Sequence, residues 1–177
     1  MYMGCRPICG LTVDIWNSNT CGVYSGFSGY ENSHFAPGQT ATPTDHKTFL
    51  RGRRFTDENG MVEFLTIIPA WYHLRTPHIH IKIFEDSKDI LTTQLFFPQE
   101  FTYEIESLSP YNSRQLSPYI NENEVISSAG KFLISLEGLV DTSSGNSTNF
   151  ISGFTPAAYE QVAVISGIGQ QIERMRM

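Results

Sequence analysis

The chain has 177 residues, 40% of them hydrophobic, which is enough for one compact domain and too few for two domains of typical size. Its formal net charge is -6, and its 12 lysines and arginines are scattered along the chain, so no nucleic-acid partner is expected. No stretch reaches the roughly 18 uninterrupted apolar residues of a membrane helix, so no membrane partner is expected either.

The N-terminal half contains three segments with the pattern of strands. Residues 11–16 alternate between apolar and polar side chains and predict a strand with one buried face. Residues 21–43 are rich in Gly, Ser, Asn and Thr and predict a long irregular loop, a kind of loop that usually carries function. Residues 49–56 and 61–68 flank the polar, glycine-ended segment 57–60, which predicts a β-hairpin.

The C-terminal half continues the strand-rich pattern. Strict alternation over residues 78–83 predicts a strand, and a further strand is expected over residues 91–97. The polar, proline-punctuated stretch 98–123 has room for a short helix. The remaining expectations are closing strands at 131–139 and 160–168, a loop at 141–153 and a frayed or helical tail at 170–177.

Together these elements predict one domain over residues 1–177, of the all-β class, built as a two-sheet β-sandwich with long functional loops and little helix.

Two histidines and a nearby tyrosine give the first indication of a metal site. His78 and His80 alternate along a strand, so both imidazoles point to one face and can share a metal ion. Alone, such a pair more often lies on a partly solvated sheet face. Tyr72 changes this interpretation, because a phenol with a pKa of about 10 becomes a ligand only beside a hard, strongly Lewis-acidic ion such as ferric iron. The mixture of Tyr and His therefore indicates iron(III).

Other ring-bearing residues give weaker signals. Trp16 lies on the Thr12, Asp14 and Trp16 face of its strand and fits the lining of a cavity about as well as a core position. His34, His46 and His73 fall in predicted loops without a paired spacing, and we expect them to be solvated.

Three blocks of the sequence resemble consecutive blocks of the intradiol ring-cleavage dioxygenases, the family of protocatechuate 3,4-dioxygenase and catechol 1,2-dioxygenase. They are VDIWNSNTCGVYSGF (13–27), FLRGRRFTDENGMVEFLTIIPAWYHLRTPHIH (49–80) and TTQLFFP (92–98). The resemblance runs from about residue 7 to residue 98 and returns faintly in AAYEQVAVISGI (157–168).

The resemblance implies a set of residue roles. The implied Fe(III) ligands are Tyr24, Tyr72, His78 and His80. Tyr72 and His80 would be axial, with the other two ligands and a hydroxide in the equatorial plane, and Tyr72 would leave the metal to accept a substrate proton. Arg75 is implied to stabilise negative charge on the substrate carbon, a preorganised electrostatic role, and Gln94 to lie near the oxygen pocket.

The implied reaction inserts both atoms of O2 into a catechol-type ring and opens it between the two hydroxyl-bearing carbons to a cis,cis-muconate. The resemblance leaves open whether the substrate is catechol, protocatechuate or hydroxyquinol, and whether the chain forms a homo-oligomer. Ala70 and Leu74 stand where family members commonly carry Gly, so we expect a narrowed entrance or a shifted Tyr72. Asn17, Ser18 and Asn19 also replace the His, Cys and Asp often seen after the Trp.

The compartment depends on the N-terminus. Cys5, Cys9 and Cys21 have neither a disulfide-framework spacing nor a zinc spacing, and we expect reduced thiols. As given, without a signal peptide, the chain predicts a cytoplasmic protein. Family members usually have a further strand before the first block, and only about ten residues precede it here, which predicts a truncated N-terminus and, if a signal was lost with it, an exported protein.

Two other functions compete with the dioxygenase interpretation. His78 and His80 followed by Glu85 copy part of the metal motif of a cupin, but the flanking glycines and a second histidine block are missing. A catalytically silent β-sandwich that binds aromatics or carbohydrate would retain the fold without the metal. The intact set of tyrosines, histidines and Arg75 favours the enzyme over both.

Overall fold

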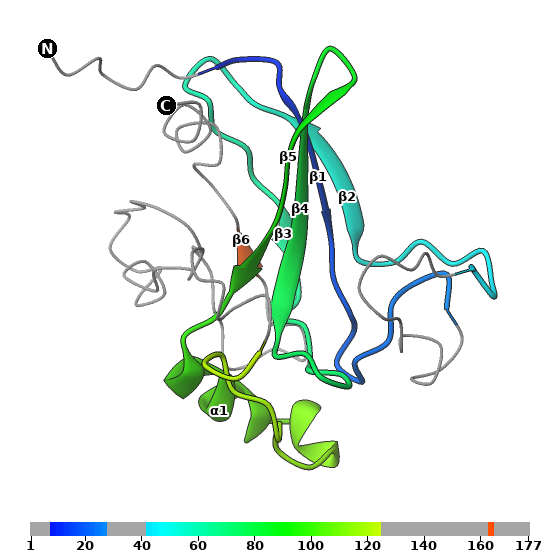
Figure 1. Cartoon of the computed structure of the whole chain (residues 1–177), viewed down its shortest axis with the longest axis vertical. Helices are drawn as coiled ribbons and strands as arrows, with labels where there is room; N and C mark the ends of the chain where they lie inside the picture. Colours follow the sequence, from blue (N-terminus) through cyan, green and yellow to red (C-terminus); the bar gives the residue numbers. More distant parts are fainter. Residues whose placement is uncertain (1–7, 28–41, 125–162, 165–177) are drawn as a thin grey trace, which may run out of the picture.

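A computed structural model describes residues 8–27, 42–124 and 163–164 (Figure 1). Four antiparallel strands form the main sheet in the order β2-β1-β4-β5, namely β1 (Thr12–Trp16), β2 (Arg51–Phe55), β4 (His78–Glu85) and β5 (Lys88–Phe96). A second sheet pairs β3 (Leu65–Thr66) with β6 (Ala163–Val164). The helical elements of the described part are α1 (Gln99–Glu106) and the short 3-10 helix η2 (Tyr111–Ser113). The predicted all-β class with two sheets and little helix is confirmed.

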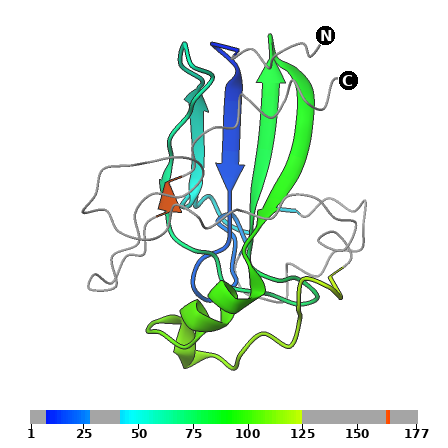
Figure 2. The ribbon, with the colours of Figure 1, turned by 90° about the vertical axis from the view of Figure 1, so that its left-hand side faces the viewer.

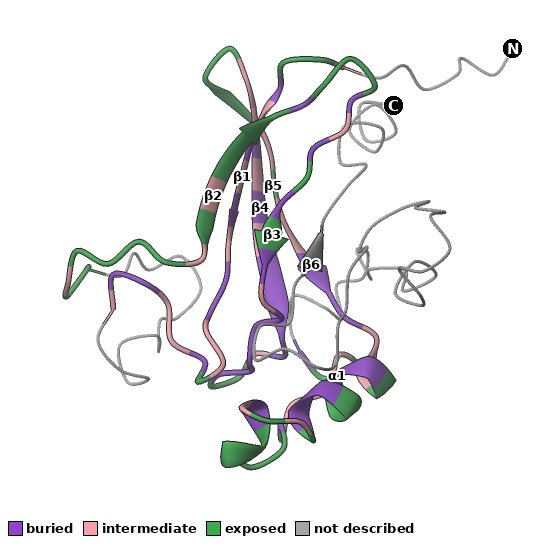
Figure 3. Ribbon diagram, turned by 180° about the vertical axis from the view of Figure 1, so that it is seen from behind, coloured by how far each residue is buried: buried purple, intermediate pink, exposed green. Residues whose placement is uncertain are grey.

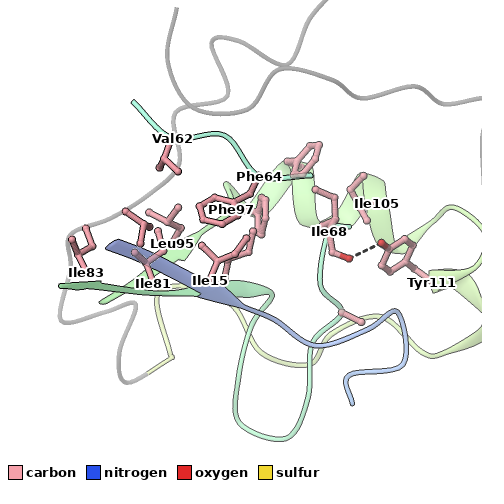
Figure 4. Close-up of a cluster of buried hydrophobic side chains, with 14 of the residues drawn as sticks. Ile15, Val62, Phe64, Ile68, Ile81, Ile83, Leu95, Phe97, Ile105 and Tyr111 are labelled. Atoms are coloured by element: carbon pink, nitrogen blue, oxygen red, sulfur yellow. Dashed lines mark hydrogen bonds between the residues drawn. The ribbon is translucent and has the colours of Figure 1, made fainter. Parts of the chain in front are cut away.

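The period-two pattern places one face of the main sheet in the core. Val13 and Ile15 from β1 and the three isoleucines of β4, Ile79, Ile81 and Ile83, are 4% exposed or less. Figure 4 shows Ile15, Ile81 and Ile83 packed beneath the segment that carries Val62, Phe64 and Ile68. Since neighbouring residues of a strand point to opposite faces, the aliphatic alternation leaves His78 and His80 on the other face.

The predicted β-hairpin is wrong, although its turn is present. Gly60 has a φ of +68° and donates its N–H to the Asp57 carbonyl at 2.9 Å, as the tight turn requires. The strands on either side do not pair with each other, because β2 pairs with β1 and β3 pairs with β6. After the turn the chain crosses the core face of the sheet, where the ring of Phe64 packs over Gly52 of β2. Burial of Phe64 thus determines the course of the chain after the turn, which the turn residues alone do not specify.

Helix α1 closes one end of the core. It begins after Pro98, and Phe101 and Ile105, four residues apart, lie on its buried face. Figure 3 shows this buried face turned toward the sheet and the exposed face turned away, and Figure 2 shows the helix at the end of the strands. The short helix predicted in residues 98–123 is confirmed.

The other predictions have mixed outcomes. The strands expected over 11–16, 78–83 and 91–97 are confirmed as β1, β4 and β5, with β5 starting earlier, at Lys88. Of the closing strand at 160–168, the two residues of β6 are described. The strand at 131–139, the loop at 141–153 and the tail at 170–177 lie outside the described residues.

Cys9 and Cys21 are free thiols, as expected, and Cys5 lies outside the described residues. No helix in the described ranges is long and apolar enough to cross a membrane.

Candidate metal centre

His78 and His80 lie at the beginning of β4, on the sheet face opposite the isoleucines. His78 is 1% exposed, and its Nδ1 lies 2.6 Å from the carbonyl of Thr76. A carbonyl oxygen only accepts hydrogen bonds, so Nδ1 carries the proton and the lone pair of Nε2 is free for another partner. This is the arrangement that metal-binding histidines usually have.

His80 lies in a row of side chains that crosses the sheet. The strand register places it beside Trp16 of β1 and Gln94 of β5. The Trp16 ring stacks on the imidazole at a centroid distance of 4.7 Å and an interplanar angle of 4°. Trp16 is therefore a neighbour of the candidate site and not a member of the core, which answers the question its sequence position left open.

Tyr24 reaches the histidines from the loop that follows β1. The side chain of Asn19 shapes this loop by accepting the N–H groups of Cys21 at 2.9 Å and Val23 at 3.0 Å. The preceding Ser18 docks the loop on the next one, because its hydroxyl donates to the carbonyl of Ala70 at 2.8 Å. Two of the residues that depart from the family pattern thus have structural roles in placing Tyr24.

Tyr72 and Arg75 are the first and last residues of a tight turn. The Arg75 N–H donates to the Tyr72 carbonyl at 2.9 Å, and the Tyr72 N–H donates back to the Arg75 carbonyl at 3.2 Å. Leu74, in the third position of the turn, has a φ of +62°, a conformation in which glycine is favoured. Its side chain is 61% exposed. The position at which the sequence resemblance implies Gly is therefore a strained turn beside the candidate site.

The two phenol oxygens and the two imidazole nitrogens form one cluster. Tyr24 Oη lies 3.0 Å from His80 Nε2, 3.3 Å from His78 Nε2 and 3.4 Å from Tyr72 Oη. His78 Nε2 also lies 3.1 Å from Tyr72 Oη and 3.2 Å from His80 Nε2. Donor atoms around one four-coordinate ion with bonds of about 2.0–2.1 Å would be separated by about 3.3 Å, which matches these spacings.

Burial keeps all four groups uncharged in the absence of an ion. Burial raises the pKa of Tyr24 well above its ordinary value, and the neighbouring Tyr72 raises it further. Burial also raises the pKa of Tyr72, although the Arg75 charge opposes this. Burial lowers the pKa of His78 well below its ordinary value, and burial followed by the Arg75 charge lowers the pKa of His80 to about 3. Both imidazoles are thus uncharged at neutral pH.

The side chain of Arg75 connects the cluster to two polar neighbours. Its Nη1 donates to Tyr72 Oη at 3.2 Å, its Nη2 donates to Gln94 Oε1, and its Nε forms an ion pair with Glu124. The structure therefore brings together all six residues named from the sequence as site candidates. Gln94 lies outside the cluster of four donor atoms and is linked to it through its hydrogen bond with Arg75.

Sequence reasoning missed residues that form contacts across long separations. Glu124 was not singled out, and neither was Gly22, where an added Cβ would lie 2.4 Å from the Trp71 carbonyl oxygen. For Gly22, its position two residues before Tyr24 could have indicated its importance from the sequence. His46 and His73 are exposed, as expected for solvated side chains, and His34 lies outside the described residues.

The cupin interpretation fails on geometry. Within the described ranges no three side chains of His, Cys, Asp or Glu gather as a metal site, so Glu85 does not join the histidines. The two phenols are what completes a four-donor set.

Comparison with known proteins places the chain in one family. Residues 2–109 match the family described as "Dioxygenase". The chain is 35% identical to an intradiol ring-cleavage dioxygenase from Tetranychus urticae, with a TM-score of 0.63 over 70% of this chain and 60% of that one. It is 30% identical to a chlorocatechol 1,2-dioxygenase from Rhodococcus opacus over 63% of this chain and 46% of that one, and 31% identical to a protocatechuate 3,4-dioxygenase beta chain from Burkholderia cepacia over 54% and 40%.

The chain belongs to the intradiol ring-cleavage dioxygenase family. It spans less than half the length of these two bacterial relatives.

Proposed function

We propose that this protein is an iron(III) enzyme that cleaves catechol-type rings between their two hydroxyl-bearing carbons, using O2 as the second substrate. The observation that carries this proposal is the cluster of Tyr24, Tyr72, His78 and His80, in which five pairs of donor atoms lie 3.0–3.4 Å apart. The names of the relatives, which include chlorocatechol and protocatechuate dioxygenases, support a catecholic substrate.

The donor set fits ferric iron on chemical grounds. Burial holds the protons on both phenols, so only a strongly Lewis-acidic cation would displace them, and zinc or magnesium seldom does so. Two phenolates and a hydroxide would balance the three positive charges of the ion, so the buried site would remain neutral overall. When bound, iron(III) would supply a Lewis acid that makes the catechol ring reactive toward O2.

The protein's own residues would bind the substrate and move its protons. Tyr72 Oη lies within 3.2 Å of Arg75 Nη1, so a proton accepted there from a substrate hydroxyl would arrive beside a fixed hydrogen-bond donor. Arg75, oriented by Gln94, would stabilise negative charge that develops on the substrate. Leu74, exposed on the same turn, is the candidate for contact with ring substituents.

The test begins with the colour of concentrated protein loaded with ferric iron. Phenolate bound to iron(III) should give a broad visible charge-transfer band that shifts when catechol is added without oxygen. Zinc-loaded protein, prepared in parallel, should be colourless. An iron-loaded protein without this band would rule out the ligand set.

Substrate range is tested by oxygen uptake. Catechol, protocatechuate and hydroxyquinol are supplied in turn, and the products are identified by mass spectrometry. We expect one O2 consumed for each ring opened to a dicarboxylic acid. A coloured protein that consumes no oxygen with any catechol would indicate a silent metal-binding module. Homo-oligomer formation stays a prediction, to be checked by light scattering.

A further inference from the structure

The guanidinium of Arg75 is engaged on all three of its nitrogens. Nη1 donates to Tyr72 Oη, Nη2 to Gln94 Oε1 and Nε to Glu124 Oε1. A planar guanidinium has a rigid donor geometry, so fixing Nε also fixes the directions of the other two nitrogens. The partner of Nε, together with Gln94 on Nη2, therefore sets where Nη1 points.

Glu124 is well placed to fix this orientation, because it is buried. The residue is 2% exposed, and the ion pair joins its side chain, 1% exposed, to an Arg75 side chain that is 17% exposed. A buried carboxylate without a counter-charge is strongly unfavourable, and so is a buried guanidinium. Each group therefore compensates the other, and the pair brings no net charge to the donor cluster.

Glu124 is the last residue of a segment that runs alongside residues 68–75, the loop that carries Tyr72. We call residues 111–124 the strap. Its contacts with residues 68–75 run in the same order along both segments. The Tyr111 hydroxyl donates to the Ile68 carbonyl at 2.6 Å, Arg114 Nη1 donates to the Trp71 carbonyl at 2.8 Å, Tyr119 Oη lies 3.3 Å from His73 Nδ1, and Glu124 pairs with Arg75.

We propose that Glu124 is a positioning residue for the dioxygenase reaction, which holds Arg75 so that Nη1 is directed at Tyr72 Oη. Its role in turnover rests on the function proposed above. Its role in orienting Arg75 rests on the ion pair alone, and is testable without iron.

The first experiment uses nuclear magnetic resonance on iron-free protein. The Arg75 Nε–H, identified by its absence in Arg75→Lys, should give a resolved signal that exchanges slowly with solvent, because the hydrogen bond to Glu124 is buried. In Glu124→Gln this signal should shift and exchange at least tenfold faster. An Arg75 signal that is unchanged in Glu124→Gln would overturn the proposal, whatever the enzyme does.

Glu106→Gln is the matched control. Glu106 is a second buried acid, 5% exposed, and its Oε2 accepts the N–H of Ser117 at 2.8 Å. The amide of glutamine retains an acceptor for that bond. The Arg75 signal should be unaffected in this variant, and an equal loss in both variants would show a general effect of replacing a buried carboxylate.

The second experiment measures steady-state kinetics of iron-loaded protein with catechol. A residue that only supports folding would leave the kcat of the folded, iron-loaded fraction unchanged. Glu124→Gln should lower kcat by about ten- to a hundredfold with a much smaller change in KM, and should shift the visible charge-transfer band, because Tyr72 Oη loses a directed donor. Unchanged kcat and band position would overturn the proposal.

Glu124→Asp covers the case in which the glutamine variant does not fold. Aspartate retains the charge and is shorter by one methylene, so it should fold, broaden the Arg75 signal and lower kcat severalfold. A wild-type kcat in Glu124→Asp would overturn the proposal. Failure of the proposed function would appear differently, as a wild-type protein that lacks the visible band while its Arg75 signal still depends on Glu124.

Discussion

Gly22 lies where the two tyrosine-bearing loops approach each other closely. An added Cβ would lie 2.4 Å from the Trp71 carbonyl oxygen and 3.3 Å from the Cβ of Tyr72. Gly22 also has a φ of +77°, which side-chain-bearing residues rarely adopt. The backbone of Trp71 cannot move away without moving Tyr72, so this glycine controls the distance between Tyr72 and Tyr24.

Gly22→Ala should separate the two phenols. We expect a loss of about 2 kcal/mol or more in the free energy of unfolding and a large fall in iron bound per chain, measured by denaturant titration and by metal analysis. Gly26→Ala is the control, since Gly26 has a φ of +87° but its nearest atom lies 3.8 Å from an added Cβ. Equal iron loss in the two variants would mean that backbone strain, and not the close approach, is responsible.

Tyr72 and the neighbouring His73 differ sharply in their surroundings. Tyr72 is buried with its oxygen 3.1 Å from His78 Nε2, whereas His73 is exposed. Tyr72→Phe removes the proposed ligand and proton acceptor together and should lower kcat by about a hundredfold or more. His73→Ala should have a far smaller effect. Oxygen-uptake rates decide, and equal effects would contradict the ligand assignment.

At the scale of elements, the strap fixes the position of the loop that carries Tyr72. It does so through hydrogen bonds from side chains of one segment to backbone carbonyls of the other. The Tyr111 hydroxyl reaches a buried carbonyl at Ile68, and Trp71 Nε1 donates to the Gln115 carbonyl at 3.2 Å (the first of these bonds is drawn in Figure 4). A loop that carries candidate ligands would otherwise be free to move. The strap thus joins the helical elements at the end of the strands to the candidate metal centre.

Tyr111→Phe tests this connection. Removing the hydroxyl leaves the Ile68 carbonyl buried without its donor, which should cost about 1–3 kcal/mol in the free energy of unfolding. Tyr103→Phe makes the same change on α1 at a side chain that is 44% exposed, and should be close to neutral. Thermal unfolding of both variants gives the comparison, and a neutral Tyr111→Phe would show that the strap is held by other contacts.

At the scale of the whole molecule, the fold buries the imidazole of His78 and half-buries that of His80, and both must remain uncharged. In the unfolded chain each histidine takes up a proton near pH 6.5, whereas in the folded chain the pKa of His80 falls to about 3 and that of His78 is also lowered. The folded state therefore binds fewer protons below pH 6.5. Its stability is present above that pH and is lost as the pH falls toward 3.

The iron-free protein should accordingly be weaker in acid. Between pH 7 and pH 5 we expect a loss of about 1–2 kcal/mol for each of the two histidines, measured by urea unfolding. His80→Gln should flatten this dependence by one histidine's share. His46→Gln, at an exposed loop position, should leave it unchanged. A wild-type curve that is flat over this range would contradict the burial of neutral imidazoles.

The sequence by itself determined the features that depend on local periodicity and residue chemistry. Alternation along β1 and β4 placed the isoleucines on one face and His78 and His80 on the other, because neighbouring strand residues point in opposite directions. The combination of phenol and imidazole indicated a hard cation, because a phenol becomes a ligand only when a strongly Lewis-acidic ion displaces its proton.

Tertiary structure decided the features in which residues distant in the chain meet. The turn after Thr56 is encoded locally, but the path beyond it follows from burying Phe64 over Gly52, so the hairpin did not form. The ion pair between Arg75 and Glu124 joins residues 49 apart and leaves no periodic trace in the sequence. Such contacts depend on how the loops pack on each other, which is a property of the folded chain and not of any one segment.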